Sequence, residues 1–547
     1  MDADQIQERE HERTAMSTPT LTGDQDAEKQ EVIKGAQIEH GHADQHPLAQ
    51  LSNVRKNVLL LVFSIAAFTD ICNISGVGVA VAQISVDIHL NISQVVWILT
   101  SYSLCFCAFL LFAGRLSDLF PAQIVFMGGF VGLGIFSLIT SFVNHSKYGF
   151  LILRGLGGIC GAMTIPSSYH LAVHMFPDPE IQKQKLGLLG LSGAIGNVLG
   201  LIIAAACMIK SYVWFFRLVC FMCFFFTGLA FLLLPYTGSS YSHSNDKTPR
   251  YKRMDIIGVI LMMLTLICFI LALTQGPIDG WKAASFIAPF ILSFPLGIGF
   301  FFWESRIDPR SALLPSTVWK ITNMLSSSLV ILVPMAFYAT SQLQYANYFQ
   351  LVRGWSPIHS AVAILPQGIT SLIVGGIVSA AFPKVISTPR ITIPVGGTLI
   401  IIAEILQSQS NGGLGNDYWR FCFPAFVIGS AGAILLFFAS AINLITYCPP
   451  EMAGVASAWT QVVAQVGGSV CLAVQAGMET NLAVWKQSGA RAFYFLLAWA
   501  AVLCFQFLIF YKTPGTPAEE HEATRKRIAA SGKDLGVISS VDEPVEK

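Results

Sequence analysis

Three ionisable side chains lie within long apolar stretches of the sequence, where charge is costly. They are Asp70, Arg154 and Glu404. A carboxylate near a buried arginine can exchange a proton with one face of a membrane, while the arginine biases its ionisation. A permanent ion pair that only joins two helices is the alternative. We predict a proton-coupling role for Asp70 and Arg154, and the role of Glu404 stays open.

Asp70 and Arg154 are predicted to lie at similar depth. Asp70 is thirteen residues into the first apolar stretch, about 20 Å from its start at 1.5 Å per residue. Arg154 is five residues into the fourth stretch, which enters from the opposite face, so it lies about 7 Å below that face. The two side chains can therefore pair if their helices face each other.

Composition requires a membrane environment for the elements that position these residues. The 547 residues are 54% hydrophobic and 12% charged, about half the usual charged fraction of ~25%. Residues 57–511 hold only 35 of the 65 charged side chains, so this region cannot present a water-facing surface. The formal net charge of +1 gives no electrostatic case for a nucleic-acid partner.

A window of about 20 apolar residues, the length that crosses a bilayer, identifies fourteen stretches. They are 57–82, 95–113, 123–143, 149–174, 185–209, 213–234, 254–274, 284–303, 322–345, 357–381, 390–408, 420–443, 452–478 and 492–511. With the N-terminus inside, the inner side carries fifteen lysines and arginines and the outer side seven. Positive charge concentrates on the cytoplasmic side, so both termini are predicted to be cytoplasmic.

The segments outside these stretches are polar. Residues 1–56 and 512–547 are predicted to be disordered cytoplasmic tails, and 235–253 a cytoplasmic linker. We interpret the histidines of the N-terminal tail as part of a solvated tract. Asn91 and Asn144 begin formal glycosylation sequons on short outer loops, and their modification stays open.

The sequence predicts no cofactor, no metal and no enzymatic activity. The twelve cysteines lie mostly in apolar runs without the spacing of a zinc site or a disulfide framework. The phosphate loop of ATP-driven pumps is missing, so no ATP partner is expected. His170 and His174 share one helix face, but no further histidine pair accompanies them.

An aspartate in the first stretch, Asp70, is followed by Trp97-x4-Tyr102 at the start of the second. This opening resembles the fourteen-span drug:proton antiporters of the major facilitator superfamily. It looks closest to the fungal branch that contains aminotriazole-resistance and low-affinity ammonium transporters. The other matching segments are Gly114–Asp118, Leu151–Ala162, Gly193–Gly200, Asp255–Gly258, Gly280–Trp281 and Phe302–Glu304.

The resemblance implies an all-α membrane protein with the major facilitator fold and fourteen transmembrane helices. Two six-helix bundles would occupy 57–234 and 321–511, with two inserted helices and a loop at 254–320. It also implies export of a drug, toxin or secondary metabolite in exchange for protons by alternating access. The expected partners are a small-molecule substrate, protons and the lipid bilayer, and the expected oligomeric state is monomeric.

Two features depart from the family pattern. Gly114, Arg115 and Asp118 match a gating loop, but no cation follows Asp118 where the family has a basic residue and then Gly-Arg-Arg/Lys. In the fifth span Gly193, Gly196 and Gly200 match the antiporter signature, but Asn197 stands where the family has proline. These glycines fall on one helix face, so we predict a helix-packing contact there.

Polar and aromatic residues within the spans are candidates for lining a substrate cavity. Transporters of alternating access bind near the midplane between their repeats. Hydrogen bonding between helices and anchoring at the membrane interface are the alternatives for these residues. The candidates are Asn73, Trp97, Tyr102, Gln342, Gln344, Gln461 and Gln465.

The sequence leaves the cargo and the coupling open. A uniporter, importer or exporter of a small polar solute such as ammonium or borate is one alternative. A non-transporting membrane sensor built on the same fold is another. The plasma membrane is the expected location, and the vacuolar membrane is the alternative.

Overall fold

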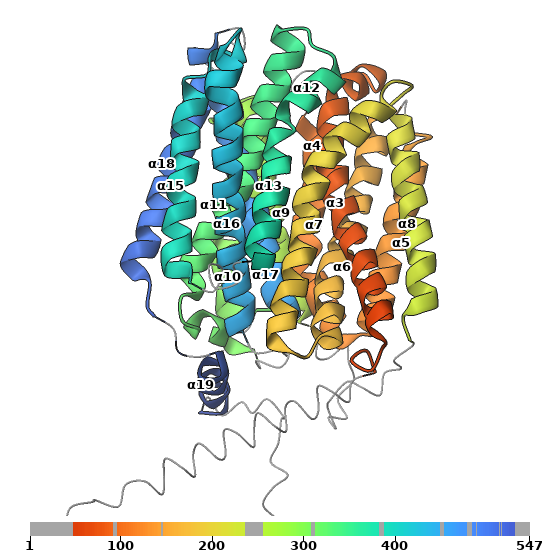
Figure 1. Ribbon diagram of the computed structural model, residues 1–547, viewed down its shortest axis with the longest axis vertical. Helices are drawn as coiled ribbons and strands as arrows, with labels where there is room; N and C mark the ends of the chain where they lie inside the picture. Colours follow the sequence, from red (N-terminus) through yellow and green to blue (C-terminus); the bar gives the residue numbers. More distant parts are fainter. Residues whose placement is uncertain are drawn as a thin grey trace, which may run out of the picture.

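The computed structural model of this protein describes the chain from residue 47 to residue 530 with short gaps. The described residues are 47–90, 96–143, 146–235, 255–307, 312–314, 316–381, 388–448, 453–478, 484–487, 489–513, 515 and 517–530. Within these ranges the fold is helical, and fourteen helices are long and apolar enough to cross a membrane (Figure 1). The histidine tract, Asn91, Asn144 and most of the 235–253 linker lie outside the described residues.

Six helices form the first bundle, which is connected by short turns. They are α3 (Asn53–Asp87), α4 (Val96–Leu119), α5 (Ala122–Thr140), α6 (Lys147–Met175), α7 (Pro179–Cys207) and α8 (Val213–Leu233). Serine side chains satisfy backbone N–H groups that the first turns leave free. Ser52 Oγ accepts from the Arg55 backbone N–H at 3.4 Å, and Ser146 Oγ accepts from Gly149 N–H at 3.3 Å.

The second bundle repeats this arrangement with more irregular helix ends. Its helices are α11 (Met324–Asn347), α12 (Pro357–Ile364), α13 (Pro366–Ala381), α15 (Pro389–Ser408), α16 (Phe423–Tyr447), α17 (Ala453–Met478) and α18 (Gly489–Phe510). The predicted span 357–381 is divided between α12 and α13 because Pro366 has no N–H to continue the hydrogen-bond ladder. Wider π-helical turns, η5 (Tyr348–Val352) and η7 (Tyr418–Cys422), adjoin α11 and α16.

Two inserted helices, α9 (Ile256–Asp279) and α10 (Ala284–Arg306), form an antiparallel pair. Asp255 caps α9 by accepting from Gly258 N–H at 2.8 Å, and its Oδ1 also accepts from Trp303 Nε1 of α10 at 2.8 Å. Glu304 Oε1 accepts from Leu313 N–H at 3.1 Å. These bonds fasten the end of the pair to the segment that leads into the second bundle.

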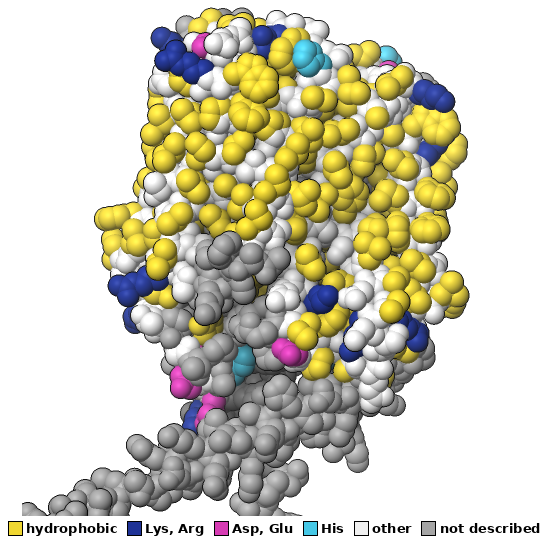
Figure 2. Space-filling view, viewed as in Figure 1, with side chains coloured by type: hydrophobic (Ala, Val, Ile, Leu, Met, Phe, Trp, Pro, Cys, Tyr) yellow, Lys and Arg dark blue, Asp and Glu magenta, His cyan; other side chains and the backbone are white. Residues whose placement is uncertain are grey.

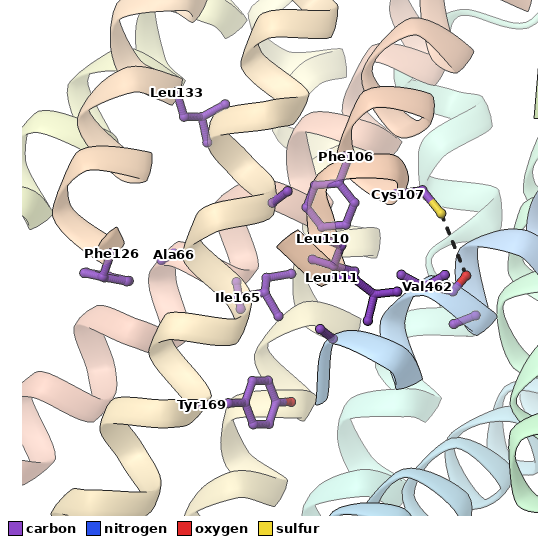
Figure 3. Packing of buried hydrophobic residues seen from close by; sticks show 14 of the residues in the cluster. Ala66, Phe106, Cys107, Leu110, Leu111, Phe126, Leu133, Ile165, Tyr169 and Val462 are labelled. Carbon is purple, nitrogen blue, oxygen red and sulfur yellow. Dashed lines mark hydrogen bonds between the residues drawn. The ribbon is translucent and has the colours of Figure 1, made fainter. Parts of the chain in front are cut away.

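The bundles meet along two seams. On one side α7 packs against α12 and α13, and on the other α4 and α6 pack against α17. Cys107 Sγ of α4 lies 3.9 Å from the Val462 carbonyl oxygen of α17 (Figure 3). The inserted helix α9 contacts both α4 and α17, so it covers this second seam.

The outer surface has the apolar character that lipid requires. Figure 2 shows a broad hydrophobic band across the face in view, with lysine and arginine gathered toward its two ends. Helix α10 lies at the periphery, and side chains such as Ile298 and Phe302 are largely exposed. An apolar belt between two charged rims is the surface expected of a protein that spans a bilayer.

The C-terminal tail differs from its prediction in one part. The sequence predicts disorder over 512–547, but the structure has a helix, α19 (Pro517–Ala530), within this tail. Glu520 Oε1 accepts from Thr322 Oγ1 at 2.6 Å, and His521 Nε2 lies 2.9 Å from the Thr446 carbonyl oxygen. Composition alone could not show these contacts, because each joins the tail to residues far away in the sequence.

Candidate functional site

Asp70 lies at the centre of the first bundle. Helix α3 begins four residues earlier and ends five residues later than the predicted span, so Asp70 is seventeen residues from either end. Its side chain is fully buried at 0% exposure. Tyr102 of α4 donates its hydroxyl to Asp70 Oδ1 at 3.3 Å, and Thr164 of α6 donates to Oδ2. The carboxylate therefore connects three helices.

Arg154 of α6 lies next to this group without pairing with the acid. Its Nη1 donates to Asn73 Oδ1 at 2.6 Å, and its guanidinium lies over the Tyr102 ring, 4.7 Å from the centroid. Among the described residues, Nε and Nη2 of Arg154 have no hydrogen-bond partner. The guanidinium is nonetheless buried, at 3% exposure, so it holds two unused donors beside the acid.

The acid and the arginine are joined through Tyr102 and Asn73, and the direct pairing that the sequence suggested does not occur in this conformation. Asp70 bonds at the level of Thr164, which is ten residues, or about 15 Å, further along α6 than Arg154. Asp70 is therefore at the middle of the bundle and not in its outer half. The long arginine side chain reaches only to Asn73, one turn along α3.

Glycines of α6 make room for this group. A Cβ on Gly158 would overlap the Tyr102 backbone carbonyl, and a Cβ on Gly161 would lie 2.9 Å from Asp70 Oδ1. Backbones can approach this closely only where no side chain intervenes. The glycine-rich stretch of the fourth span therefore holds α6 against α4 and brings Tyr102 to the acid.

The structure brings two of the seven predicted cavity residues to Asp70, namely Asn73 and Tyr102. Gln344 lies in the second bundle, where it is fully buried and accepts from Gln475 Nε2 at 2.7 Å. Among the described residues, no hydrogen bond joins the remaining candidates to the Asp70 group, and their role stays a prediction. These are Trp97, Gln342, Gln461 and Gln465.

The predicted gating loop is helical. Gly114, Arg115 and Asp118 belong to the last turns of α4, which continues to Leu119, and Pro121 precedes α5 directly. The connection between these helices is thus shorter than the predicted spans implied, because the polar residues still satisfy their backbones within the helix. Gly114 is buried and Arg115 is half-buried. The side chain of Asp118 lies outside the described residues.

The glycines of the fifth span pack α7 against α3, as their shared face predicts. A Cβ on Gly196 would lie 3.0 Å from Phe68 Cα, and one on Gly200 would lie 2.9 Å from Cys72 Cα. Gly193 is different, since its Cβ would only meet Ile71 Cγ1 at an ordinary 3.5 Å. Asn197 is half-buried on the same helix.

Sequence reasoning missed Thr164, Gln407 and Gln475. Thr164 is fully buried and bonds the acid, and Gln407 and Gln475 are buried in the second bundle. Uncharged polar residues are common in membrane helices, so their presence alone is a weak signal. A partner for Asp70 could have been sought among hydroxyl residues near the middle of the fourth span, but three such residues occur there: Thr164, Ser167 and Ser168.

The site has no feature of a metal centre. Across the described ranges, no group of three or more histidine, cysteine, aspartate or glutamate side chains could hold a metal ion. His170 and His174 stack with ring centroids 4.5 Å apart, and His174 Nδ1 lies 2.9 Å from the His170 carbonyl oxygen. The groups that bond Asp70 are hydroxyls, so the arrangement supports proton binding and hydrogen bonding.

Two helical bundles with a buried acid and arginine at the centre of one are the architecture of a secondary membrane transporter. The family model of the Major Facilitator Superfamily matches residues 63–471. This match covers more than half of the chain, which therefore belongs to that superfamily and is a multi-pass membrane protein.

Relatives and a solved structure agree with this assignment. The tetracenomycin C resistance and export protein of Streptomyces glaucescens is 27% identical over 73% of this chain and 71% of its own length. The multidrug transporter mfsC of Aspergillus fumigatus is 24% identical over 77% and 79%. The structure of the human organic anion transporter MFSD10 (TETRAN) covers 84% of this chain and 99% of its own, with 14% identity and a TM-score of 0.52, and supports the fold.

Proposed function

We propose that this protein exports small organic molecules in exchange for protons by alternating access, with both termini in the cytoplasm. Asp70 carries the coupled proton. The observation behind this proposal is a fully buried carboxylate at mid-helix that is held by two hydroxyl groups and by no cation. Ionisable groups inside membrane proteins are costly and mark proton pathways.

The hydrogen bonds of Asp70 depend on its protonation state. An ionised carboxylate only accepts hydrogen bonds, and a protonated one also donates. When Asp70 binds a proton, one of its two hydroxyl donors must turn away. Thr164 has an alternative acceptor ready, because its Oγ1 lies 2.8 Å from the Gly161 carbonyl oxygen. Proton binding thus changes the connection between α3 and α6 without leaving a donor unpaired.

Arg154 supplies the opposing charge. Its two unused donors lie within the same group, so a shift of the guanidinium toward an ionised Asp70 would replace bonds from neutral hydroxyls by bonds between opposite charges. A protonated Asp70 gives no such advantage, and Arg154 then keeps its bond to Asn73. Proton binding would therefore select between two arrangements of α3, α4 and α6. Coupling by alternating access requires such a choice between two conformations.

The proposed direction of transport, which is export, rests on the names of two relatives. One is named as an export protein and another as a multidrug transporter. Both align with most of this chain, so drug-like organic molecules are the proposed cargo class.

The full chain in liposomes that enclose a pH-sensitive dye tests the proposal. Ethidium, puromycin, aminotriazole, borate and ammonium would be added in turn. At least one organic compound should cross the membrane and move protons in the opposite direction. Cargo movement that ignores the pH gradient would indicate a uniporter, and binding without movement would indicate a sensor, and either would contradict the proposal.

Asp70→Asn should abolish gradient-driven accumulation of that compound while exchange of labelled for unlabelled compound continues. The amide keeps the shape of the side chain and cannot release a proton. Asp279→Asn is the matched control, because Asp279 is an exposed acid at the end of α9 that bonds Ser285 Oγ at 2.7 Å. Normal accumulation by the Asp70→Asn protein would show that another group carries the proton.

A further inference from the structure

A second buried acid, Glu404 of α15, lies in the other bundle. Its side chain is fully buried at 0% exposure. Neither of its carboxyl oxygens has a hydrogen-bond partner in the part of the chain that the structure describes. Asp70, in contrast, is held by two hydroxyl groups. Glu404 is four residues from the end of α15, and this end of the helix lies on the side of the molecule away from α19 (Figure 1).

A polar side chain without partners accompanies Glu404. Gln407 lies one turn further along the same face of α15 and is also fully buried. Among the described residues, neither its amide nitrogen nor its amide oxygen has a hydrogen-bond partner. Unpartnered buried polar groups are rare, because each forfeits its hydration. Two of them in adjacent turns of one helix therefore call for a functional explanation.

The groups that face Glu404 offer no positive charge. Tyr345 of α11 and Cys471 of α17 lie within electrostatic range of it. Neither α11 nor α17 contains a lysine, arginine or histidine, and α16 has no ionisable side chain before Tyr447 at its far end. The remaining titratable groups on the neighbouring elements are Tyr338 of α11, whose hydroxyl lies 2.6 Å from Ser371 Oγ, Tyr418, Arg420 and Cys422 of η7, and Arg491, Tyr494 and Cys504 of α18.

These remaining groups are placed away from the acid or are already engaged. Arg420 and Arg491 are exposed. Tyr418 donates its hydroxyl to the Ala363 carbonyl at 2.8 Å, and Tyr494 accepts from Gln409 at 3.3 Å. Cys504 faces Gly397, about two turns below Glu404. Cys422 interacts with Tyr345 rather than with the acid.

The surroundings of Glu404 select the smallest ligand. The acid itself is fully buried, and a metal ion held there would need several further ligands. Within the described ranges, no group of three or more histidine, cysteine, aspartate or glutamate side chains could hold a metal ion. A proton needs no further ligand, and it removes the charge whose burial without a counter-ion costs several kcal/mol.

We propose that Glu404 is a second proton-binding site of this transporter, located in the second bundle and separate from Asp70. The assignment deepens the proposed proton exchange and rests on it for its role in transport. In the conformation described here the acid is neutral. It exchanges its proton when α11 moves away from the end of α15.

A hydrogen-bonded chain shows where that movement would occur. Tyr345 and Ser410 hydroxyl groups lie 2.9 Å apart, and Ser410 Oγ donates to the Gln407 carbonyl at 2.8 Å. The ring of Tyr345 also packs against two other aromatic rings. Its centroid lies 5.3 Å from that of Trp485 and 5.9 Å from that of Phe493. These aromatic rings and the chain close the second bundle over Glu404, so releasing Tyr345 would open the acid to water.

Infrared spectroscopy of the full chain in lipid nanodiscs at neutral pH tests the proposal without a cargo. A protonated carboxyl group has a carbonyl stretch that an ionised one lacks, and the stretch shifts when deuterium replaces the proton. Glu404→Gln should remove one component of this band, and Glu404→Asp should retain a carboxylic-acid component if the glutamine variant fails to fold. Asp70→Asn, Asp255→Asn and Glu304→Gln identify the contributions of the other buried acids among the described residues.

The component assigned to Glu404 should shift within minutes of transfer into deuterated buffer. A spectrum that Glu404→Gln leaves unchanged would show that the acid is ionised, which overturns the proposal. A component that persists unshifted for hours would show a permanently protonated structural acid, which also overturns it. Failure of proton-coupled transport would be seen separately in the liposome assay, because the infrared measurement requires neither cargo nor gradient.

Discussion

Tyr102 has two separate functions within the Asp70 group. Its hydroxyl bonds the acid at 3.3 Å, and its ring lies under the Arg154 guanidinium. A single residue therefore positions both charges, and the two contacts can be removed one at a time. A tyrosine at this point couples the acid to the arginine although the two do not touch.

Tyr102→Phe should lower proton-coupled transport roughly tenfold or more, because a hydrogen bond to a charged group contributes about 1.5–3 kcal/mol. Tyr102→Leu should lower it further, since it also removes the cation–π contact, which contributes about 0.5–2 kcal/mol. Initial rates in the liposome assay, at matched protein content, give the comparison. Tyr148→Phe is the control, because Tyr148 is 69% exposed. Equal rates for the phenylalanine variant and the unchanged protein would contradict a role for the hydroxyl.

Asp70, Arg154 and Glu404 could be identified from the sequence as candidate functional residues, because an ionisable side chain in an apolar stretch is unusual. Thr164 carries no such signal, since threonine is ordinary in membrane helices. The packing of the helices against one another could not be predicted from the sequence either. Depth measured from a predicted boundary placed Asp70 in the outer half, because the predicted span ended at residue 82, whereas α3 is 35 residues long and Asp70 lies seventeen residues from either end.

Helices α3 and α7 show how glycine spacing becomes a backbone contact. Gly196 lies against the Phe68 backbone, and Ser75 Oγ donates to the Gly196 carbonyl at 3.4 Å. Backbone atoms cannot rotate aside as a side chain can, so this contact fixes the distance between the two helices. Asp70 is two residues after Phe68, and its position therefore depends on the same contact.

Gly196→Ala should destabilise the protein by about 1–3 kcal/mol, the usual cost of overpacking a tight contact. Gly193→Ala is the matched control on the same helix, because its Cβ would meet only Ile71 at 3.5 Å. The control should be neutral or slightly stabilising, since alanine is the better helix former. Thermal unfolding in detergent, followed by size-exclusion chromatography, measures both. Equal midpoints for the two variants would show that α3 and α7 are further apart.

The sequence predicted the number of membrane-spanning helices well and the positions of the helix ends poorly. Length and apolarity predicted the fourteen spans, and the described residues contain fourteen such helices. Polar ends were misplaced at α4, where Gly114 to Asp118 remain helical, and at α19, which lies in a segment too polar to suggest an ordered contact. The end of α4 was missed because its polar residues satisfy their backbones within the helix, and Ser117 Oγ donates to the Gly114 carbonyl at 2.7 Å. Helix α19 was missed because its partners, Thr322 and Thr446, are distant in the sequence.

The two bundles touch on both sides of the molecule, and a cargo that passes between them requires these seams to open in turn. One seam follows the length of α7. Leu201 and Ala205 cluster with Ala361 and Ile364 toward one end of this helix. Towards its other end Leu191 clusters with Val378, Ile434 and Phe438. Val198 lies between these clusters, where it fills the space beside Gly368 of α13.

The pairing of Val198 with Gly368 can be tested by moving the side chain to the other helix. Gly368→Ala alone places a Cβ on top of Val198, whose branched side chain has few rotamers with which to avoid it. We expect this variant to lose stability by about 1–3 kcal/mol and to transport poorly, because the bundles can no longer close along α7. Adding Val198→Gly should restore part of both, since the space that valine occupied then receives the new methyl group.

Unfolding midpoints and transport rates of the two single variants and the double variant complete a mutant cycle. Residues in contact show interaction energies of about 0.5–3 kcal/mol, whereas distant ones are additive within a few tenths. Val198→Gly alone measures the loss of packing and of helix propensity, so only the interaction energy reports on the contact. An additive cycle would mean that α7 and α13 do not meet at this point. A cycle with strong coupling in stability and none in transport would place the moving seam elsewhere, on the side where α4 meets α17.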